Sequence, residues 1–409
     1  MVTLRDIQAA QERLAGRIIQ TPLVYSQTLS RRSGRQVFLK LENLQTTGSF
    51  KLRGSLNKLK LLPPTGSAAG VVAASAGNHA QGLAYAAALA GRPATIIMPQ
   101  WASLSKQLAT ESYGGTVVRH GQTLAEALAR AQELAQTGLT FIHPFDDPEI
   151  IAGQGTLGLE LLAALPDLEA VLIPVGGGGL AAGVAVALKE SKPRIRVYGI
   201  QTQLVPSAQA AFAAGHPVAV AGAPTLADGI NVTRLGEHTF PILQRYLDGL
   251  ALVSEDQIAD AVLLLLERKK ILSEGAGAVP AAALLQQLAA ADLGRQVVLV
   301  ISGGNMDVPL LERVVQRGLL HSRRLLSLSV ILPDSPGSLG RLTTLLGQTG
   351  ANILSLSHDR LGLDLPIQDT RVKIDLETLG DGHCQKILET LVQAGYRLQE
   401  AGQVRREAG

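Results

Sequence analysis

Short apolar runs alternate with Ala- and Leu-rich helical patterns from the start of the chain to about residue 315. The runs that are typical of buried parallel strands lie at 71–74, 95–98, 170–175, 195–200 and 297–301. A polar or glycine-rich loop follows each run, and a helical pattern follows each loop. This alternation predicts an α/β fold with open sheets, in which ligands bind beyond the carboxyl ends of the strands.

The pattern changes near residue 320 and predicts a second domain. Strands are expected at 325–332, 351–357, 370–376 and 396–398, and helices at 339–346 and 383–394. The order β-α-β-β-α-β is that of a ferredoxin-like unit. We therefore expect a first domain at 1–320, with a small subdomain at about 60–148 inserted in it, and a second domain at 325–409.

Composition excludes several classes of function. A net charge of +3, with no block of like charges, argues against nucleic-acid binding. No apolar run reaches the roughly 18 residues that cross a bilayer, so no membrane association is expected. The single cysteine, Cys384, excludes an internal disulfide framework and fits a reducing compartment, the cytoplasm. The eight histidines show no metal-ligand spacing, so no metal site is expected.

Lys51 stands at the end of a polar, glycine-containing turn and directly follows Phe50. A lysine that forms a Schiff base must lose its proton, and desolvation or cationic neighbours lower its pKa. Most lysines are solvated surface charges, so Lys51 alone carries little weight. Three further segments strengthen the interpretation, because each follows a predicted strand: 75–82, 174–180 and 302–305.

A run of four glycines at 176–179 lies between a predicted strand and a predicted helix at 180–189. Glycines let backbone N–H groups close on an anion, and the helix N-terminus adds a favourable dipole. The run therefore predicts a phosphate site. With Ala181 it also fits the dinucleotide fingerprint G-x-G-x-x-A. That alternative needs an acidic residue about 20 positions on, whereas the next strand ends at 200–202 without a carboxylate.

Ser302 directly follows the predicted strand at 297–301. Its hydroxyl can bond a ring nitrogen without forcing protonation; the alternative is that it only starts a turn. At 75–79, backbone donors at a helix start could bind a carboxylate, and the Asn78 amide could reach a ring hydroxyl. His79 could be a base or a satisfied buried histidine. A carbonyl-reactive lysine, a phosphate cradle and a strand-end hydroxyl together predict a pyridoxal phosphate enzyme.

Eight specific motifs follow one another along the chain. They are SFKLRG at 49–54, SAGNH at 75–79, HPFDD at 143–147, GQGT at 153–156, GGGG at 176–179, ADGI at 227–230, EGAGA at 274–278 and SGGN at 302–305. On these motifs the chain resembles the threonine dehydratase (threonine ammonia-lyase) family of fold type II pyridoxal phosphate enzymes, in the form with one C-terminal ACT regulatory domain. The resemblance runs from about residue 4 to the C-terminus.

The resemblance implies roles for residues of these motifs. Lys51 would bind pyridoxal 5'-phosphate as a Schiff base and serve as the catalytic base. The implied cofactor-binding residues are Phe50, Lys51, Asn78, Gly176, Gly177, Gly178, Gly179, Leu180 and Ser302. The residues that would hold the substrate carboxylate are Ser75, Ala76, Gly77, Asn78 and His79. Glu274 is similar to an acid that the family places near the ring, although it could be a loop carboxylate.

Two positions depart from related enzymes. Serine racemases carry an acid/base serine where this chain has Ala76, so racemisation is expected to be slight. Related enzymes with a divalent-ion site use a glutamate where this chain has Gln201, and a hard cation prefers charged oxygen ligands. A serine racemase or a hydroxyaspartate dehydratase is the enzyme alternative. A catalytically silent amino-acid sensor is the non-enzyme alternative.

The implied reaction converts L-threonine to 2-oxobutanoate and ammonia, and also L-serine to pyruvate. The ACT domain would bind an amino-acid effector, with isoleucine among its candidates, and would control activity. The expected effector-binding residues are Asp334, Gly337, Ser338, Leu339 and Asn352. Because such domains usually pair, the resemblance implies a homodimer or a homotetramer.

Overall fold

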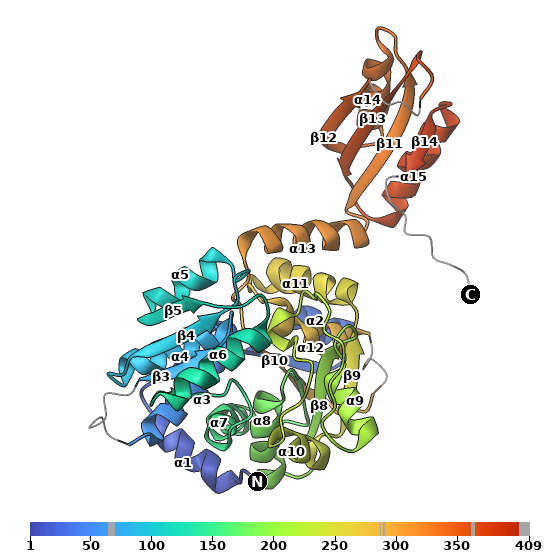
Figure 1. Cartoon of the computed structure of the whole chain (residues 1–409). Helices are drawn as coiled ribbons and strands as arrows, with labels where there is room; N and C mark the ends of the chain where they lie inside the picture. Colours follow the sequence, from blue (N-terminus) through green and yellow to red (C-terminus); the bar gives the residue numbers. More distant parts are fainter. Residues whose placement is uncertain (64–69, 287, 289–290, 361–364, 401–409) are drawn as a thin grey trace. The chain divides into compact units, whose positions relative to one another are not determined.

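The computed structural model describes residues 1–63, 70–286, 288, 291–360 and 365–400 (Figure 1). The chain divides into two compact units, Met1–Leu310 and Leu311–Gly409. Among the described residues, the strands form three sheets, of which two belong to the first unit. This arrangement confirms the predicted α/β class with open sheets. No helix in the described part of the chain is long and apolar enough to span a membrane.

The larger sheet of the first unit has the strand order β1-β2-β10-β7-β8-β9. Its strands are β1 (Leu23–Tyr25), β2 (Gln36–Leu41), β7 (Ala170–Pro174), β8 (Arg196–Thr202), β9 (Gly249–Val253) and β10 (Gln296–Ile301). Neighbouring strands are parallel, except that β1 pairs antiparallel with β2 at one edge. The strands predicted at 170–175, 195–200 and 297–301 are therefore confirmed.

The smaller sheet is parallel throughout and has the strand order β5-β4-β3-β6. Its strands are β3 (Val71–Ala74), β4 (Ala94–Met98), β5 (Gly115–Arg119) and β6 (Thr140–Phe141), with helices α4 (Asn78–Leu89), α5 (Leu104–Ser112) and α6 (Leu124–Gln136). We call these elements the small-sheet body and the rest of the first unit the large-sheet body. In sequence, the small-sheet body follows α3 (Lys51–Leu61) and precedes α7 (Pro148–Ala164).

Ion pairs and a hydrogen bond join α3, which precedes the small-sheet body, to the start of α7, which follows it. Lys58 of α3 forms ion pairs with Asp147 at 2.7 Å and with Glu149 at 2.9 Å, where α7 begins. The Asn57 amide also donates to the Glu149 carbonyl at 2.6 Å. Gly54 and Gly153 let the two helices cross closely, because a Cβ on Gly153 would overlap the backbone of Gly54.

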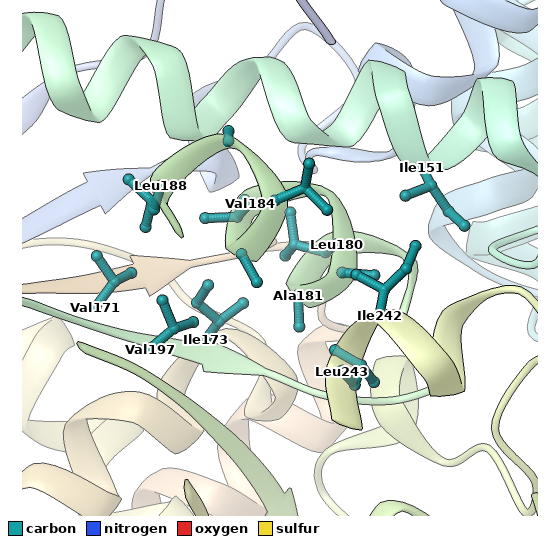
Figure 2. Close-up of a cluster of buried hydrophobic side chains, with 14 of the residues drawn as sticks. Ile151, Val171, Ile173, Leu180, Ala181, Val184, Leu188, Val197, Ile242 and Leu243 are labelled. Atoms are coloured by element: carbon teal, nitrogen blue, oxygen red, sulfur yellow. The ribbon is translucent and has the colours of Figure 1, made fainter. Parts of the chain in front are cut away.

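The core of the large-sheet body is packed around α8 (Gly179–Ser191), which is buried along most of its length. Figure 2 shows this helix between strands β7 and β8 on one side and α7 and α10 (Thr239–Tyr246) on the other. A Cβ on Gly183 would overlap the backbone of α7, so glycine is required at this crossing. The labelled side chains are Ile151, Val171, Ile173, Leu180, Ala181, Val184, Leu188, Val197, Ile242 and Leu243.

The other helices of the large-sheet body connect and cover its strands. They are α1 (Leu4–Leu14), α2 (Gln27–Ser33), η1 (Glu42–Leu44), α9 (Ser207–Ala214), η2 (Asp228–Ile230), α11 (Glu255–Lys269) and α12 (Gly275–Leu285). Helix α13 (Val308–His321) follows β10 and leads into the second unit.

The second unit has the predicted β-α-β-β-α-β order. Its elements are β11 (Leu325–Pro333), α14 (Ser338–Gln348), β12 (Asn352–Asp359), β13 (Asp369–Glu377), α15 (Asp381–Gln393) and β14 (Arg397–Glu400). The sheet is antiparallel, with the order β12-β13-β11-β14. Alternate residues of β11 and β13, such as Val330 and Val372, are buried in the core of this unit with side chains of both helices.

Candidate active site

Loops that follow β3, β7 and β10 carry the predicted site residues, and the segment before Lys51 is bonded to one of them. The Phe50 N–H donates to the Ser302 carbonyl at 3.1 Å, and the Gly304 N–H donates to the Gly48 carbonyl at 2.9 Å. Ser49 and Gly303 form an antiparallel bridge between these contacts. The start of α3 is therefore fixed directly beside the end of β10.

Lys51 is the first residue of α3, and its side chain is partly buried. The Nζ atom donates to the Pro144 carbonyl at 2.8 Å and lies 5.1 Å from the centre of the Phe50 ring. Burial lowers the pKa of Lys51 to about 8, although the Glu274 carboxylate acts in the opposite direction. About a tenth of Lys51 is thus the free amine at pH 7, far more than for a solvated lysine, and a Schiff-base lysine requires the free amine.

The glycine loop at 176–179 has the form of an anion cradle. A Cβ on Gly177 would overlap the Phe145 ring, and Gly178 has a φ of +99° and packs on Thr239. Side chains are thus excluded on the packed side of the loop. Within the described part of the chain, no acceptor meets the backbone N–H groups of residues 176–181, where α8 begins. These free donors at a helix N-terminus fit a phosphate group.

Asn78 is the middle member of a short chain of side-chain hydrogen bonds that joins Glu274 to Asn305. Ser302 is the first residue after β10, and it is only 3% exposed. The Asn78 amide donates to Glu274 Oε1 at 2.8 Å, and its oxygen accepts from the Asn305 amide at 2.8 Å. The structure therefore brings Asn78 and Glu274 together, and it places Asn305, to which the sequence assigned no role, between two loops of the site.

Glu274 caps α12 and is only 4% exposed. Burial raises the pKa of this carboxyl well above its ordinary value, and the Asp228 carboxylate raises it further. The hydrogen bond from Asn78 and the charges of Lys106 and Lys51 act in the opposite direction. The carboxyl can therefore hold a proton near neutral pH beside the predicted cofactor site.

The loop at 75–79 presents backbone donors at the start of α4. The N–H groups of Ala76, Asn78 and His79 meet no acceptor within the described residues. The His79 side chain does not take part, because it is buried and its Nε2 bonds the Ile142 carbonyl at 3.1 Å. Burial, together with the charge of Lys51, lowers the pKa of His79 to about 3. The imidazole stays neutral, so the interpretation as a satisfied buried histidine is favoured over that of a base.

The loop at 143–147 is a structural support whose role the sequence did not indicate. His143 Nδ1 accepts the N–H groups of Phe145 at 3.2 Å and Asp146 at 2.7 Å. Burial lowers the pKa of His143 to about 4, which keeps Nδ1 free to accept. The Asp146 carboxylate accepts three N–H groups at the start of α10, from Glu237, His238 and Thr239. The motif HPFDD was visible in the sequence, but nothing in it showed that its proline carbonyl would meet Lys51.

The Gln201 side chain is bonded to backbone groups of neighbouring elements. Its amide oxygen accepts the N–H groups of Ala208 at 2.9 Å and Gln209 at 3.3 Å at the start of α9. Its amide nitrogen donates to the Val175 carbonyl at 3.2 Å. In the part of the chain that the structure describes, no group of three His, Cys, Asp or Glu side chains is placed to hold a metal ion.

The predicted effector residues are not all brought together within the second unit. Asp334 and Gly337 form the turn between β11 and α14, and Ser335 Oγ and Ser338 Oγ lie 2.9 Å apart. Asn352 is paired with Glu377, which also pairs with the first residue of β11. Since Asp334 follows the last residue of β11, Asn352 lies at the opposite end of the sheet, about 30 Å away along the strand.

A partly buried lysine of lowered pKa thus lies at the start of α3 beside the end of β10, and an anion cradle and a buried hydroxyl follow β7 and β10 of the larger sheet. These features define an enzyme that holds an aldehyde cofactor with an anionic group, and they fit pyridoxal 5'-phosphate. The model of the family described as "Pyridoxal-phosphate dependent enzyme" matches residues 14–303. The chain belongs to this family and uses pyridoxal phosphate as its cofactor.

Individual relatives cover most of the chain. An L-threonine ammonia-lyase of Thermotoga maritima is 45% identical over 98% of this chain and 100% of its own length. The crystal structure of a T.th. threonine deaminase is 43% identical, with a TM-score of 0.70 over 75% of this chain and 99% of that one. The structure of maize serine racemase is 32% identical, with a TM-score of 0.73 over 79% of this chain and 99% of the racemase chain.

Proposed function

We propose that this protein is an L-threonine ammonia-lyase, which converts L-threonine to 2-oxobutanoate and ammonia and also deaminates L-serine to pyruvate. The proposal is supported by the near full-length relative that carries this name, with 45% identity. Within the site the assignment rests on Lys51, because burial lowers its pKa to about 8 and its Nζ bonds the carbonyl of Pro144, whose neighbour Phe145 packs on the glycine loop. A missing methyl group costs about 1–3 kcal/mol, so serine is the poorer substrate.

Pyridoxal phosphate supplies an electron sink that stabilises negative charge on the substrate Cα. The residues proposed to hold it are Lys51 at the aldehyde, residues 176–180 at the phosphate and Ser302 at the ring nitrogen. Phe50 would pack on the ring, and Asn78 would meet the ring hydroxyl. The N–H groups of residues 75–79 would bind the substrate carboxylate and so hold the Cα–H bond toward Lys51. The Lys51 amine, set free when the substrate amine replaces it at the aldehyde, would take the Cα proton. The β-hydroxyl would take up a proton and leave as water, and hydrolysis of the released enamine would give the 2-oxo acid and ammonia.

A substrate panel tests this proposal. Purified holoenzyme is supplied with L-threonine, L-serine and hydroxyaspartate, and the keto acid and any D-amino acid are measured. We expect 2-oxobutanoate from threonine as the fastest product. Racemisation should be slight, because Ala76 offers no side-chain proton on the second face of the substrate. Rapid D-serine formation would favour the racemase alternative, and no turnover of any substrate would favour the amino-acid sensor.

Replacing Ser302 by Asp should lower kcat/KM for threonine about tenfold or more, which corresponds to ~1.4 kcal/mol. The carboxylate would hold the ring nitrogen protonated, and a more stable carbanion leads more readily to side reactions. Cofactor should remain bound, because the lysine and the glycine loop are intact. Absorbance spectra and steady-state kinetics provide the measurement. If both are unchanged, Ser302 does not contact the ring.

The second unit is proposed to be an ACT domain that binds an amino-acid effector at the turn formed by residues 334–339. Asn352 lies at the other end of the same sheet, so it joins this site only if a second copy supplies it. We therefore propose a homodimer or a homotetramer in which these units pair. The protein is further proposed to act in the cytoplasm, with small amino acids as its partners rather than nucleic acid or membrane.

Effector binding should change the threonine affinity about 5- to 150-fold, a coupling of roughly 1–3 kcal/mol. Deletion of residues 325–409 should leave an active enzyme without this response, since the T.th. threonine deaminase structure is matched over 99% of its length by 75% of this chain. Threonine saturation curves with and without isoleucine or valine measure the effect. A full-length enzyme whose curve no amino acid alters would rule out the regulatory proposal.

A further inference from the structure

An ion pair joins the two bodies of the first unit next to the buried Glu274 carboxyl. Lys106 Nζ of α5, in the small-sheet body, lies 2.7 Å from Asp228 Oδ2 of η2, in the large-sheet body. The residue after Asp228 is Gly229, where a Cβ would lie 3.2 Å from Glu274 Oε1. The η2 turn therefore packs directly against the carboxyl that hydrogen-bonds Asn78.

The start of α5 is held near this pair by a second contact. The hydroxyls of Ser103 and Ser105 both donate to Asp307 Oδ1, which belongs to the segment after β10. Lys106 is only 19% exposed along its side chain, and burial lowers its pKa while Asp228 and then Asp307 raise it by a larger amount. Lys106 is thus kept charged between two carboxylates of the large-sheet body.

Four groups from different elements face Glu274. Asn78 of α4 donates a hydrogen bond to it, and Lys51 of α3, Asp228 of η2 and Lys106 of α5 act on it through their charges. The negative charge of Asp228 opposes ionisation of Glu274, whereas the positive charges of the two lysines favour it. An Asp228 that is paired with Lys106 opposes ionisation less than an unpaired one.

We propose that Lys106 and Asp228 are positioning residues that together set the charge of the Glu274 carboxyl beside Lys51. The inference rests on the proposed function, because it concerns the same site. Since the two residues come from different bodies of the first unit, the proton on Glu274 depends on whether the small-sheet body lies against the large-sheet body. Withdrawal of Lys106 leaves Asp228 unpaired, and Glu274 then keeps its proton to higher pH.

Charge-changing variants of the holoenzyme test this proposal through the pH dependence of the bound-cofactor absorbance. We expect one titration in this absorbance that Glu274→Gln removes. Lys106→Met should move its midpoint to higher pH and Asp228→Asn to lower pH, each on the order of one pH unit. Lys106→Arg keeps the charge and should titrate like the wild type. The double variant should return toward the wild-type midpoint.

The deciding result is that the midpoints of Lys106→Met and Asp228→Asn shift in opposite directions. A general loosening of the site would shift both midpoints in the same direction. Lys189→Met is the matched control, since Lys189 forms a 2.7 Å ion pair with Asp248 within the large-sheet body. The titration midpoint of this variant should equal that of the wild type. Unshifted midpoints, or shifts of equal sign, would overturn the proposal. The titration needs no substrate, so a failure of threonine turnover leaves this result readable and separately tells against the proposed function.

Discussion

Lys51→Ala abolishes turnover: we expect kcat to fall by at least about 10⁴-fold, or ~5.5 kcal/mol. The substitution removes both the covalent anchor of the cofactor and the amine that takes the Cα proton. It also removes the 2.8 Å hydrogen bond to the Pro144 carbonyl. Two measurements apply to the purified variant: keto-acid production from threonine, and mass spectrometry of the cofactor-linked peptide after borohydride reduction.

Lys60→Ala is the control for this experiment. Lys60 is an exposed lysine in the last turn of the same helix, α3, so its loss should leave both the linkage and the turnover close to wild type. The assignment of Lys51 is refuted by a Lys51→Ala variant that still makes keto acid at a near-native rate. It is also refuted if borohydride fixes the cofactor to another lysine of the wild-type enzyme.

Arg53→Met should lower the free energy of unfolding by about 3–5 kcal/mol, because it removes the direct ion-pair partner of the fully buried Glu42 carboxylate and leaves Glu160 with Lys40 alone. The Arg53 side chain is 0% exposed and bonds Glu42 at 2.7 Å and Glu160 at 2.6 Å. Lys40 completes the network through its 2.5 Å contact with Glu160. Burial alone would raise the pKa of Glu42, but the charge and hydrogen bonds of Arg53 keep it below its ordinary value.

Denaturant titration of the holoenzyme measures this loss of stability. Arg130→Met is the matched control, since Arg130 makes a 2.8 Å pair with Glu133 on an exposed helix surface. Such surface pairs contribute at most about 1 kcal/mol. Adding Glu42→Gln to Arg53→Met should recover part of the loss, because it removes one unpaired charge. Equal stabilities of Arg53→Met and Arg130→Met would contradict the proposed role of the network.

The network also shows why one strand was hard to predict. Strands such as β3 and β10 are apolar along their length, so their burial is visible in the sequence. Strand β2 carries Lys40, whose burial depends on Glu160, 120 residues away. A charged residue in a short run indicates a solvated segment unless its partner is known. The sequence therefore predicts the centre of the large sheet better than its edge.

The site shows the same division between local and distant information. The glycine run, Lys51 and Ser302 are predicted from local patterns, because glycine spacing and strand ends can be recognised from neighbouring residues in the sequence. The contact of Lys51 with the Pro144 carbonyl joins atoms 93 positions apart, and every residue has a carbonyl, so no residue type marks it. The position of Asn352 follows from strand register, which a strand prediction alone does not supply.

The ion pairs and the hydrogen bond that join the start of α7 to the end of α3 have a mechanical consequence. Lys58 and Asn57 hold α3 and the start of α7 together, and these are the helices that precede and follow the small-sheet body in the sequence. A body attached at one edge can rotate about that edge without stretching either segment. Its displacement would grow with distance from the edge, so a small rotation would separate the far side of this body most from the large-sheet body. A disulfide that joins α3 to α7 should therefore leave substrate entry intact, whereas one that joins α5 to η2 should trap whatever the site contains.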